Sequence, residues 1–176
     1  MALPVRYARR NRSEEAMENT VARCKQSAVQ EMETFLKHFS YVPDDKLTWT
    51  PTPTAKSAIR IAAHTALYAG RFAKMIRERR LPPTDNLAEW LAEREAEEIA
   101  ITSREEVERV FRAGTAEVLA ALDTLTPDEM ELSLDSGLGW SVPMKSLMSL
   151  PGWHVVLHTG QIDFLQTCWG DQTIYI

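Results

Sequence analysis

The chain has 176 residues, of which 44% are hydrophobic and 26% charged, and its 25 acidic and 20 basic side chains give a formal net charge of −5. This length and composition predict one globular domain over residues 1–176 with a full core, and exclude low-complexity and collagen-like chains. The acidic balance argues against a nucleic-acid partner, and no apolar run is long enough to predict a membrane-spanning helix.

The chain start and the cysteines bear on the cellular compartment. Residues 1–12 contain four arginines and no acid, but no apolar stretch follows them as a signal peptide requires. These residues are therefore expected to form a flexible basic tail. Cys24 and Cys168 lie far apart and form no CxxC pair, which favours a reducing compartment, the cytoplasm.

Two long helices are predicted in the first half of the chain. Apolar residues at three- and four-residue steps indicate a helix over about Ser13–Phe39, with Ser13 as its N-cap. A second helix is expected over about Thr54–Arg80, and Pro82-Pro83 prevents it from continuing. Alanines beside the apolar face of this second helix would let a neighbouring helix approach closely.

The long connection Leu81–Thr102 contains a short predicted helix at about Leu87–Glu95. A third long helix is expected from Ser103 to Leu122, because Ser103 and Glu106 have the spacing of a capping box. The length of the connection before this helix allows the chain to cross over the bundle before it begins.

A fourth long helix is predicted over about Val142–Trp169, with Gly170 as its C-terminal stop. Pro151-Gly152 interrupts the pattern, so that either the helix kinks there or its main segment begins near Pro151. Ser133–Leu138 alternates only weakly and is interpreted as a loop. Together these elements predict an all-α fold, a four-helix bundle with a long connection between its second and third helices.

Three histidines form a candidate metal site. His154 and His158 are four residues apart, which puts both imidazoles on one helix face, and His64 lies at the centre of the apolar stripe of another helix. Imidazole suits zinc, nickel, iron and copper. A single core histidine is more often structural than a ligand, but three on two core stripes favour a shared ion.

Other residues near these histidines are candidates for the same site. Tyr68 lies one turn after His64, and Gln161 follows His158 closely on the inward side, so either could face the ion as a catalytic hydrogen-bond donor. The alternative is a core tyrosine and a surface glutamine. Asp163 could orient a ligand but is expected to face solvent, and His38 is interpreted as a surface or helix-capping residue.

Two segments resemble the DinB-like (YfiT-like) superfamily of metal-binding four-helix bundles. One is Trp49-Thr50-Pro51 followed by Ser57, Ile61 and His64, and the other is His154-x-x-x-His158-Thr159-Gly160-Gln161-Ile162. The resemblance covers nearly the whole chain. It implies that His64, His154 and His158 are the metal ligands. Pro151-Gly152 departs from the family pattern and could shift the helix that carries His154.

The resemblance also implies an up-down-down-up bundle, frequent homodimers, and zinc, nickel or a similar divalent ion. Characterised members of the family include hydrolases and enzymes that depend on a low-molecular-weight thiol, namely mycothiol, bacillithiol or glutathione. Two hypotheses follow. One is a metal-dependent hydrolase or thiol transferase acting on a small molecule, and the other is a non-catalytic, stress-related binding protein with a structural metal.

Trp153 and Trp169 look exposed, which also favours a homodimer.

Overall fold

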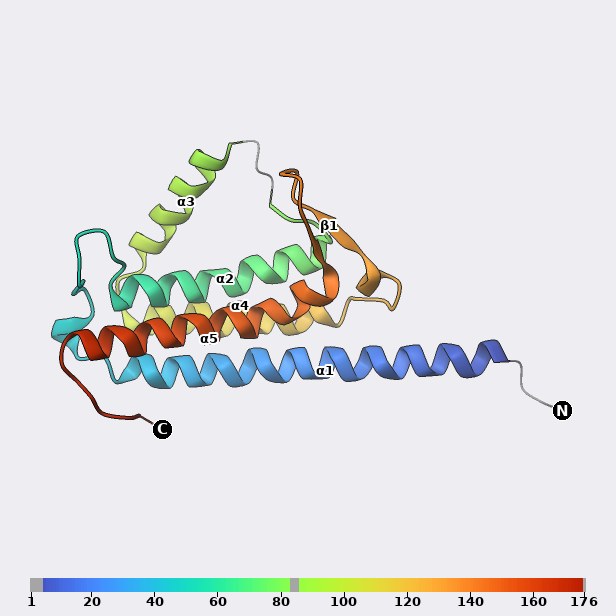
Figure 1. Ribbon diagram of the computed structural model, residues 1–176, viewed down its shortest axis with the longest axis horizontal. Coiled ribbons are helices and arrows are strands. Elements are labelled where there is room, and N and C mark those ends of the chain that lie inside the picture. Colours follow the sequence, from blue (N-terminus) through green and yellow to red (C-terminus); the bar gives the residue numbers. More distant parts are fainter. Residues whose placement is uncertain (1–4, 83–85, 176) are drawn as a thin grey trace.

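The computed structural model describes residues 5–82 and 86–175, and within them the fold is mostly helical (Figure 1). Four long helices lie side by side: α1 (Val5–Ser40), α2 (Ala58–Glu78), α4 (Arg104–Leu122) and α5 (Met144–Cys168). The shorter α3 (Leu87–Ala100) projects from this bundle, and two single turns, η1 (Asp44–Lys46) and η2 (Glu129–Glu131), lie in its connections. The expected helical fold is confirmed, and the short helix expected in the connection is α3, which extends to Ala100 rather than ending near Glu95.

Helix α3 returns the chain from the end of α2 to the beginning of α4 (Figure 1). As a result, α2 and α4 run in one direction, and α1 and α5 run in the other. Side-chain caps explain where two of these helices begin, the predicted one at Ser103 and a second at Asn86. The Ser103 hydroxyl accepts a hydrogen bond from the Glu106 amide at 3.1 Å, and Asn86 caps α3 by accepting from the Glu89 amide.

Small residues set the closest helix contacts. A Cβ on Gly114 of α4 would lie 2.8 Å from the Gly70 backbone nitrogen and 2.9 Å from the Ala69 Cβ on α2. A Cβ on Gly152 of α5 would lie 2.2 Å from the Ser27 hydroxyl oxygen of α1. The buried alanines of α2 serve the same purpose, so α2 packs tightly between its neighbours as its sequence predicted.

The interruption at Pro151-Gly152 does not divide the last helix. Helix α5 runs continuously from Met144 to Cys168 with Pro151 inside it, so the alternative of a helix that starts near Pro151 is wrong. Both residues are buried, and Gly152 is the point at which α5 meets α1. The first helix also begins earlier than expected, at Val5, while residues 1–4 of the expected tail lie outside the described residues.

The loop expected at Ser133–Leu138 is instead half of a small antiparallel hairpin. Strand β1 (Ser133–Asp135) pairs with β2 (Ser141–Pro143), with Leu134 opposite Val142. Each strand has three residues, too few to produce a clear alternation in the sequence. Gly137 and Gly139 adopt φ values of 72° and 83°, which favour glycine. These two glycines therefore mark the turn between the strands rather than a longer loop.

Three further observations bear on the sequence predictions. Across the described residues, no helix combines the length and apolar character needed to cross a membrane. Cys24 and Cys168 are both free cysteines. Trp169 is half-buried and packs edge-on against Trp49 with ring centroids 6.0 Å apart, whereas Trp153 is 58% exposed. The expectation of exposure therefore holds for Trp153 but not for Trp169.

Candidate metal centre

Three imidazoles converge between α2 and α5. The Nε2 atom of His154 lies 3.3 Å from Nε2 of His64 and 3.0 Å from Nε2 of His158. One potential ligand atom from each of the three histidines lies within 4.8 Å of the others. The convergence that the sequence predicted is therefore present. It depends on α5 remaining helical through Pro151, which keeps His154 and His158 one turn apart on the face toward α2.

Glu98 of α3 fixes the orientation of His64. The His64 Nδ1 atom lies 2.6 Å from Glu98 Oε1, and the Lys56 ammonium donates to the other oxygen of the same carboxylate. Glu98 is 3% exposed, so this carboxylate is buried in contact with both partners. Because an ionised carboxylate only accepts hydrogen bonds, Nδ1 of His64 carries the proton and its Nε2 lone pair points to the other histidines.

Gln161 fixes the orientation of His158 in a similar way. Its side-chain oxygen accepts a hydrogen bond from His158 Nδ1 at 2.7 Å, which leaves the Nε2 lone pair of His158 directed at His154. Two lone pairs therefore face a single nitrogen of His154, which carries at most one proton. At least one of these two close contacts then lacks a proton between the nitrogens. A cation at the point of convergence could instead be coordinated by the lone pairs of all three Nε2 atoms.

The spacing of the nitrogens also fits a metal ion. With metal–nitrogen bonds of about 2.0–2.1 Å, a tetrahedral zinc site holds two imidazole nitrogens about 3.3 Å apart. The observed separations of 3.0 and 3.3 Å are close to that value. A buried carboxylate on the far nitrogen of a ligand histidine is a common means of orienting it. His64, His154 and His158 could thus hold one divalent ion and leave a coordination position open.

All three histidines are neutral near pH 7. Burial, together with the positive charge that His158, His64 and Arg71 would present, lowers the pKa of His154 to about 3. Burial also lowers the pKa of His64, although its hydrogen bond to Glu98 partly opposes that shift. The pKa of His158 is lowered by burial as well. Neutral imidazole is the form that binds metals, so no proton has to leave before an ion enters.

Opposing effects act on the carboxylate beside the cluster. Burial raises the pKa of Glu98, but the hydrogen bonds from Lys56 and His64 more than offset this, and the net pKa lies below its usual value. Glu98 is therefore ionised at neutral pH. Its negative charge lies one imidazole away from the point of convergence and would stabilise a cation there.

Tyr68 packs against the cluster rather than projecting away from it. Its ring stacks on that of His154 with centroids 5.0 Å apart and planes at 25°, and it lies 4.4 Å from the centroid of His64. Gln161 is exposed and contacts the outer nitrogen of His158. Of the two residues proposed as catalytic, the tyrosine thus lines the site, and the glutamine orients a histidine.

Two other residues considered from the sequence form a pair away from this cluster. Nδ1 of His38 lies 2.7 Å from Asp163 Oδ1, which joins the end of α1 to α5. His38 is absent from the group of converging ligand atoms, in agreement with its interpretation as a non-ligand. Asp163 is half-buried and binds His38, so it neither faces solvent alone nor orients a triad histidine.

Comparison with known proteins identifies the family. A model of the DinB superfamily matches residues 28–162, which include all three histidines. The chain belongs to the DinB superfamily. No curated protein sequence matches it. Among solved structures of this fold, the DinB-like protein YjoA from Bacillus subtilis has 17% sequence identity and a TM-score of 0.61, over 88% of this chain and 96% of that one.

A second solved structure with the DinB-like fold is a mycothiol-dependent maleylpyruvate isomerase. It is 13% identical to this chain and has a TM-score of 0.62 over 81% of it. The DinB superfamily chain described here spans about 60% of the length of that isomerase. At these identities the similarity establishes the shared fold, and the isomerase activity is a property of that neighbour.

Glu98 is the site residue of this DinB superfamily chain that the sequence did not predict. It lies in an acidic stretch with Glu93, Glu95 and Glu97, and such a stretch is typical of a solvated helix face. The short helix was also expected to end at Glu95, three residues before Glu98. Only the packing of α3 across α2 distinguishes this carboxylate from its neighbours, so the sequence contained no signal for its role.

Proposed function

We propose that His64, His154 and His158 bind one divalent metal ion, zinc or nickel, and that this ion serves an enzymatic reaction. The observation that carries the proposal is the convergence of three Nε2 atoms, two of which must present lone pairs because their Nδ1 atoms donate to Glu98 and Gln161. Three protein ligands with an open position are typical of catalytic rather than structural zinc.

The reaction class that we propose is hydrolysis or transfer of a low-molecular-weight thiol to a small molecule. A bound divalent ion would lower the pKa of a water or of a thiol at its open position. The mycothiol dependence of one structural neighbour supports the thiol alternative. Within this chain, Glu98 and Gln161 would hold two ligand imidazoles in their binding orientation, and Tyr68 would line the space beside the ion.

The alternative is a non-catalytic, stress-related binding protein in which the metal stabilises the fold. The two can be separated experimentally. We expect elemental analysis of the protein, loaded with zinc or nickel and desalted, to find about one ion per chain. The metal-loaded protein should then conjugate mycothiol, bacillithiol or glutathione to an electrophile, or hydrolyse an ester. Bound metal without any such activity, combined with a large loss of thermal stability on chelation, would favour the structural alternative.

Substitution of Glu98 tests the positioning of His64. We expect Glu98→Gln to weaken zinc or nickel binding by about 10- to 100-fold, the usual cost of removing a partner that orients a ligand. Competition with a fluorescent zinc chelator measures the change. Glu95→Gln removes the same charge from an exposed position on α3 that contacts Arg60, and serves as the matched control. Equal affinities for the two variants would contradict the role of Glu98.

We also propose that the protein is a homodimer that pairs through α5. Trp153, Val156, Leu157 and Phe164 follow one another at helical spacing on the outer face of that helix, and each is between 47% and 64% exposed. An apolar stripe of this kind is typical of an interface, and a stable dimer would bury on the order of 1,200 Å² or more.

Light scattering tests this assembly. We expect a mass near twice the 20.0 kDa of the chain, and a mass near that of one chain for Phe164→Asp, which places a charge in the stripe. A wild-type mass of one chain at micromolar concentration would contradict the dimer.

We further propose a cytoplasmic location, since Cys24 and Cys168 are both free thiols. The proposed partner is a small-molecule substrate rather than nucleic acid or a membrane, consistent with the net charge of −5.

A further inference from the structure

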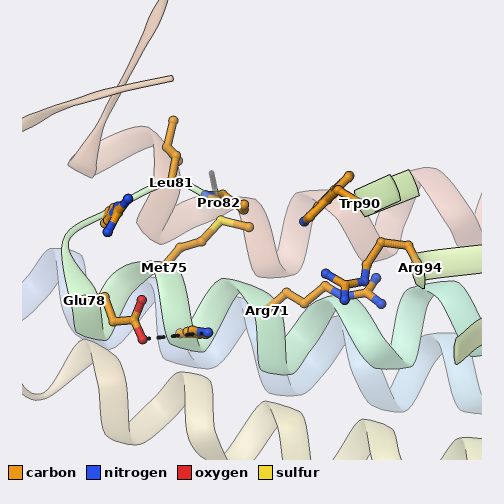
Figure 2. A pocket seen from close by; sticks show the side chains of 9 residues that line it. Arg71, Met75, Glu78, Leu81, Pro82, Trp90 and Arg94 are labelled. Carbon is orange, nitrogen blue, oxygen red and sulfur yellow. Dashed lines mark ion pairs between the residues drawn. The ribbon is translucent and has the colours of Figure 1, made fainter. Parts of the chain in front are cut away.

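A cavity of about 420 Å³ lies between α2 and α3 (Figure 2). Its volume is that of a small-molecule site. Four cationic side chains line it, Arg71, Lys74, Arg80 and Arg94, against one carboxylate, Glu78. In a chain with a net charge of −5, this lining is unusually rich in positive charge.

The two ends of the cavity differ in character. Figure 2 shows Arg71 of α2 and Arg94 of α3 with their guanidinium groups close together at one end, beside Trp90. Met75, Leu81 and Pro82 lie at the other end. The cavity therefore has a cationic end at Arg71 and Arg94, and at its other end an apolar patch of Met75, Leu81 and Pro82 beside the charged side chains of Lys74, Glu78 and Arg80.

The two guanidinium groups are only partly neutralised by their surroundings. Both donate to Glu97, which is their one shared carboxylate. The additional contact of Arg94 with Glu93 is longer, at 3.3 Å, and Glu93 is exposed, so this pair is screened by solvent. Nη1 of Arg71 and Nε of Arg94 are enclosed without a hydrogen-bond partner among the described residues. An anion bound at this end would add to Glu97 and to the solvent-screened Glu93 in balancing the two positive charges.

Aromatic rings complete the cationic end. The Arg94 guanidinium lies 5.4 Å from the ring centroid of Trp90, and that of Arg71 lies 4.7 Å from the ring centroid of Tyr68. These contacts hold the guanidinium groups in place without consuming all of their hydrogen-bond donors. Tyr68 also stacks on His154, so this ring lies between Arg71 and the histidine cluster.

We propose that this cavity binds an organic carboxylate with a flat apolar body. The carboxylate lies at the Arg71–Arg94 pair, and the body lies between Trp90 and Met75. Guanidinium groups can form bidentate hydrogen bonds with a carboxylate. A purely inorganic anion should bind more weakly, because it has no apolar body to contact the apolar side chains. The proposal goes beyond the metal-dependent function and does not require an ion on the histidines.

Binding is tested with 2-naphthoate as the probe, by calorimetric titration of the full chain in the presence of a chelator. We expect saturable binding at one site per chain with a dissociation constant below about 1 mM. Uncharged 2-naphthamide should bind at least about tenfold more weakly, because it cannot form charged hydrogen bonds. Absence of saturable 2-naphthoate binding, or equal binding of the amide, would overturn the proposal whether or not the histidines hold a metal.

Two variants locate the binding site. Arg94→Gln should weaken 2-naphthoate binding about 10- to 100-fold, because it removes a cation that binds the carboxylate. Trp90→Leu should also weaken it, because it removes the ring that contacts the apolar body of the probe. Arg109→Gln removes the same charge from an exposed position outside the cavity and should have no effect. Circular dichroism checks that each variant keeps its helices. Wild-type affinity in a folded Arg94→Gln or Trp90→Leu variant would place the probe elsewhere and refute the site.

Discussion

Replacing His158 by alanine should weaken zinc or nickel binding by more than about 100-fold while the helical fold remains intact. The variant removes one of three converging Nε2 atoms, and the loss of a ligand should exceed the 10- to 100-fold cost of losing an orienting partner. The fold should survive because the buried apolar faces of the four long helices do not involve this side chain. Competition with a zinc chelator gives the affinity, and circular dichroism gives the helix content.

His38→Ala is the matched control for this experiment. His38 is also a half-buried histidine with one side-chain partner, Asp163, but it does not belong to the cluster. Its variant should bind metal as the wild type does. If His158→Ala were unfolded, the ion would have a structural role, and the catalytic proposal would lose its main support. If it bound metal with wild-type affinity, the ligand assignment would be wrong.

Gly114→Ala should lower the free energy of unfolding by about 1–3 kcal/mol, the usual cost of overpacking a core. The added methyl group would lie 2.8 Å from the Gly70 nitrogen and 2.9 Å from the Ala69 Cβ, and a backbone atom cannot move aside as a flexible side chain can. Helices α2 and α4 would have to separate at their closest contact. Thermal unfolding should show a melting temperature lower by roughly 3–10 °C.

Gly70→Ala provides a control on the facing helix. A Cβ at Gly70 meets no atom within 4 Å, so the change should be neutral or should stabilise by up to about 1 kcal/mol through higher helix propensity. Opposite signs for the two substitutions would establish that helix separation, rather than the general effect of replacing a glycine, causes the loss. A stabilised Gly114→Ala variant would show that α2 and α4 are not in such close contact.

The helices and the placement of the three histidines on helix faces follow from local sequence patterns. Periodic apolar stripes, the Ser103 capping box and the alanines of α2 are local signals, and the structure has helices at each of those places. His154 and His158 share a helix, so their spacing alone fixes their relative placement. The position of His64 on a second core stripe made a shared site possible, and the resemblance to the DinB-like superfamily assigned all three histidines to it.

The burial of Glu98 and the continuity of α5 could not be predicted from local patterns, because they depend on contacts between distant parts of the chain. Glu98 reads as one of several solvated acids until α3 crosses α2 and buries it against His64 and Lys56. Pro151 is typical of a helix start, but α5 is continuous through it, and the adjacent Gly152 packs closely against Ser27 of α1. In each case the deciding contact joins residues more than thirty positions apart, and no local propensity or spacing encodes such a contact.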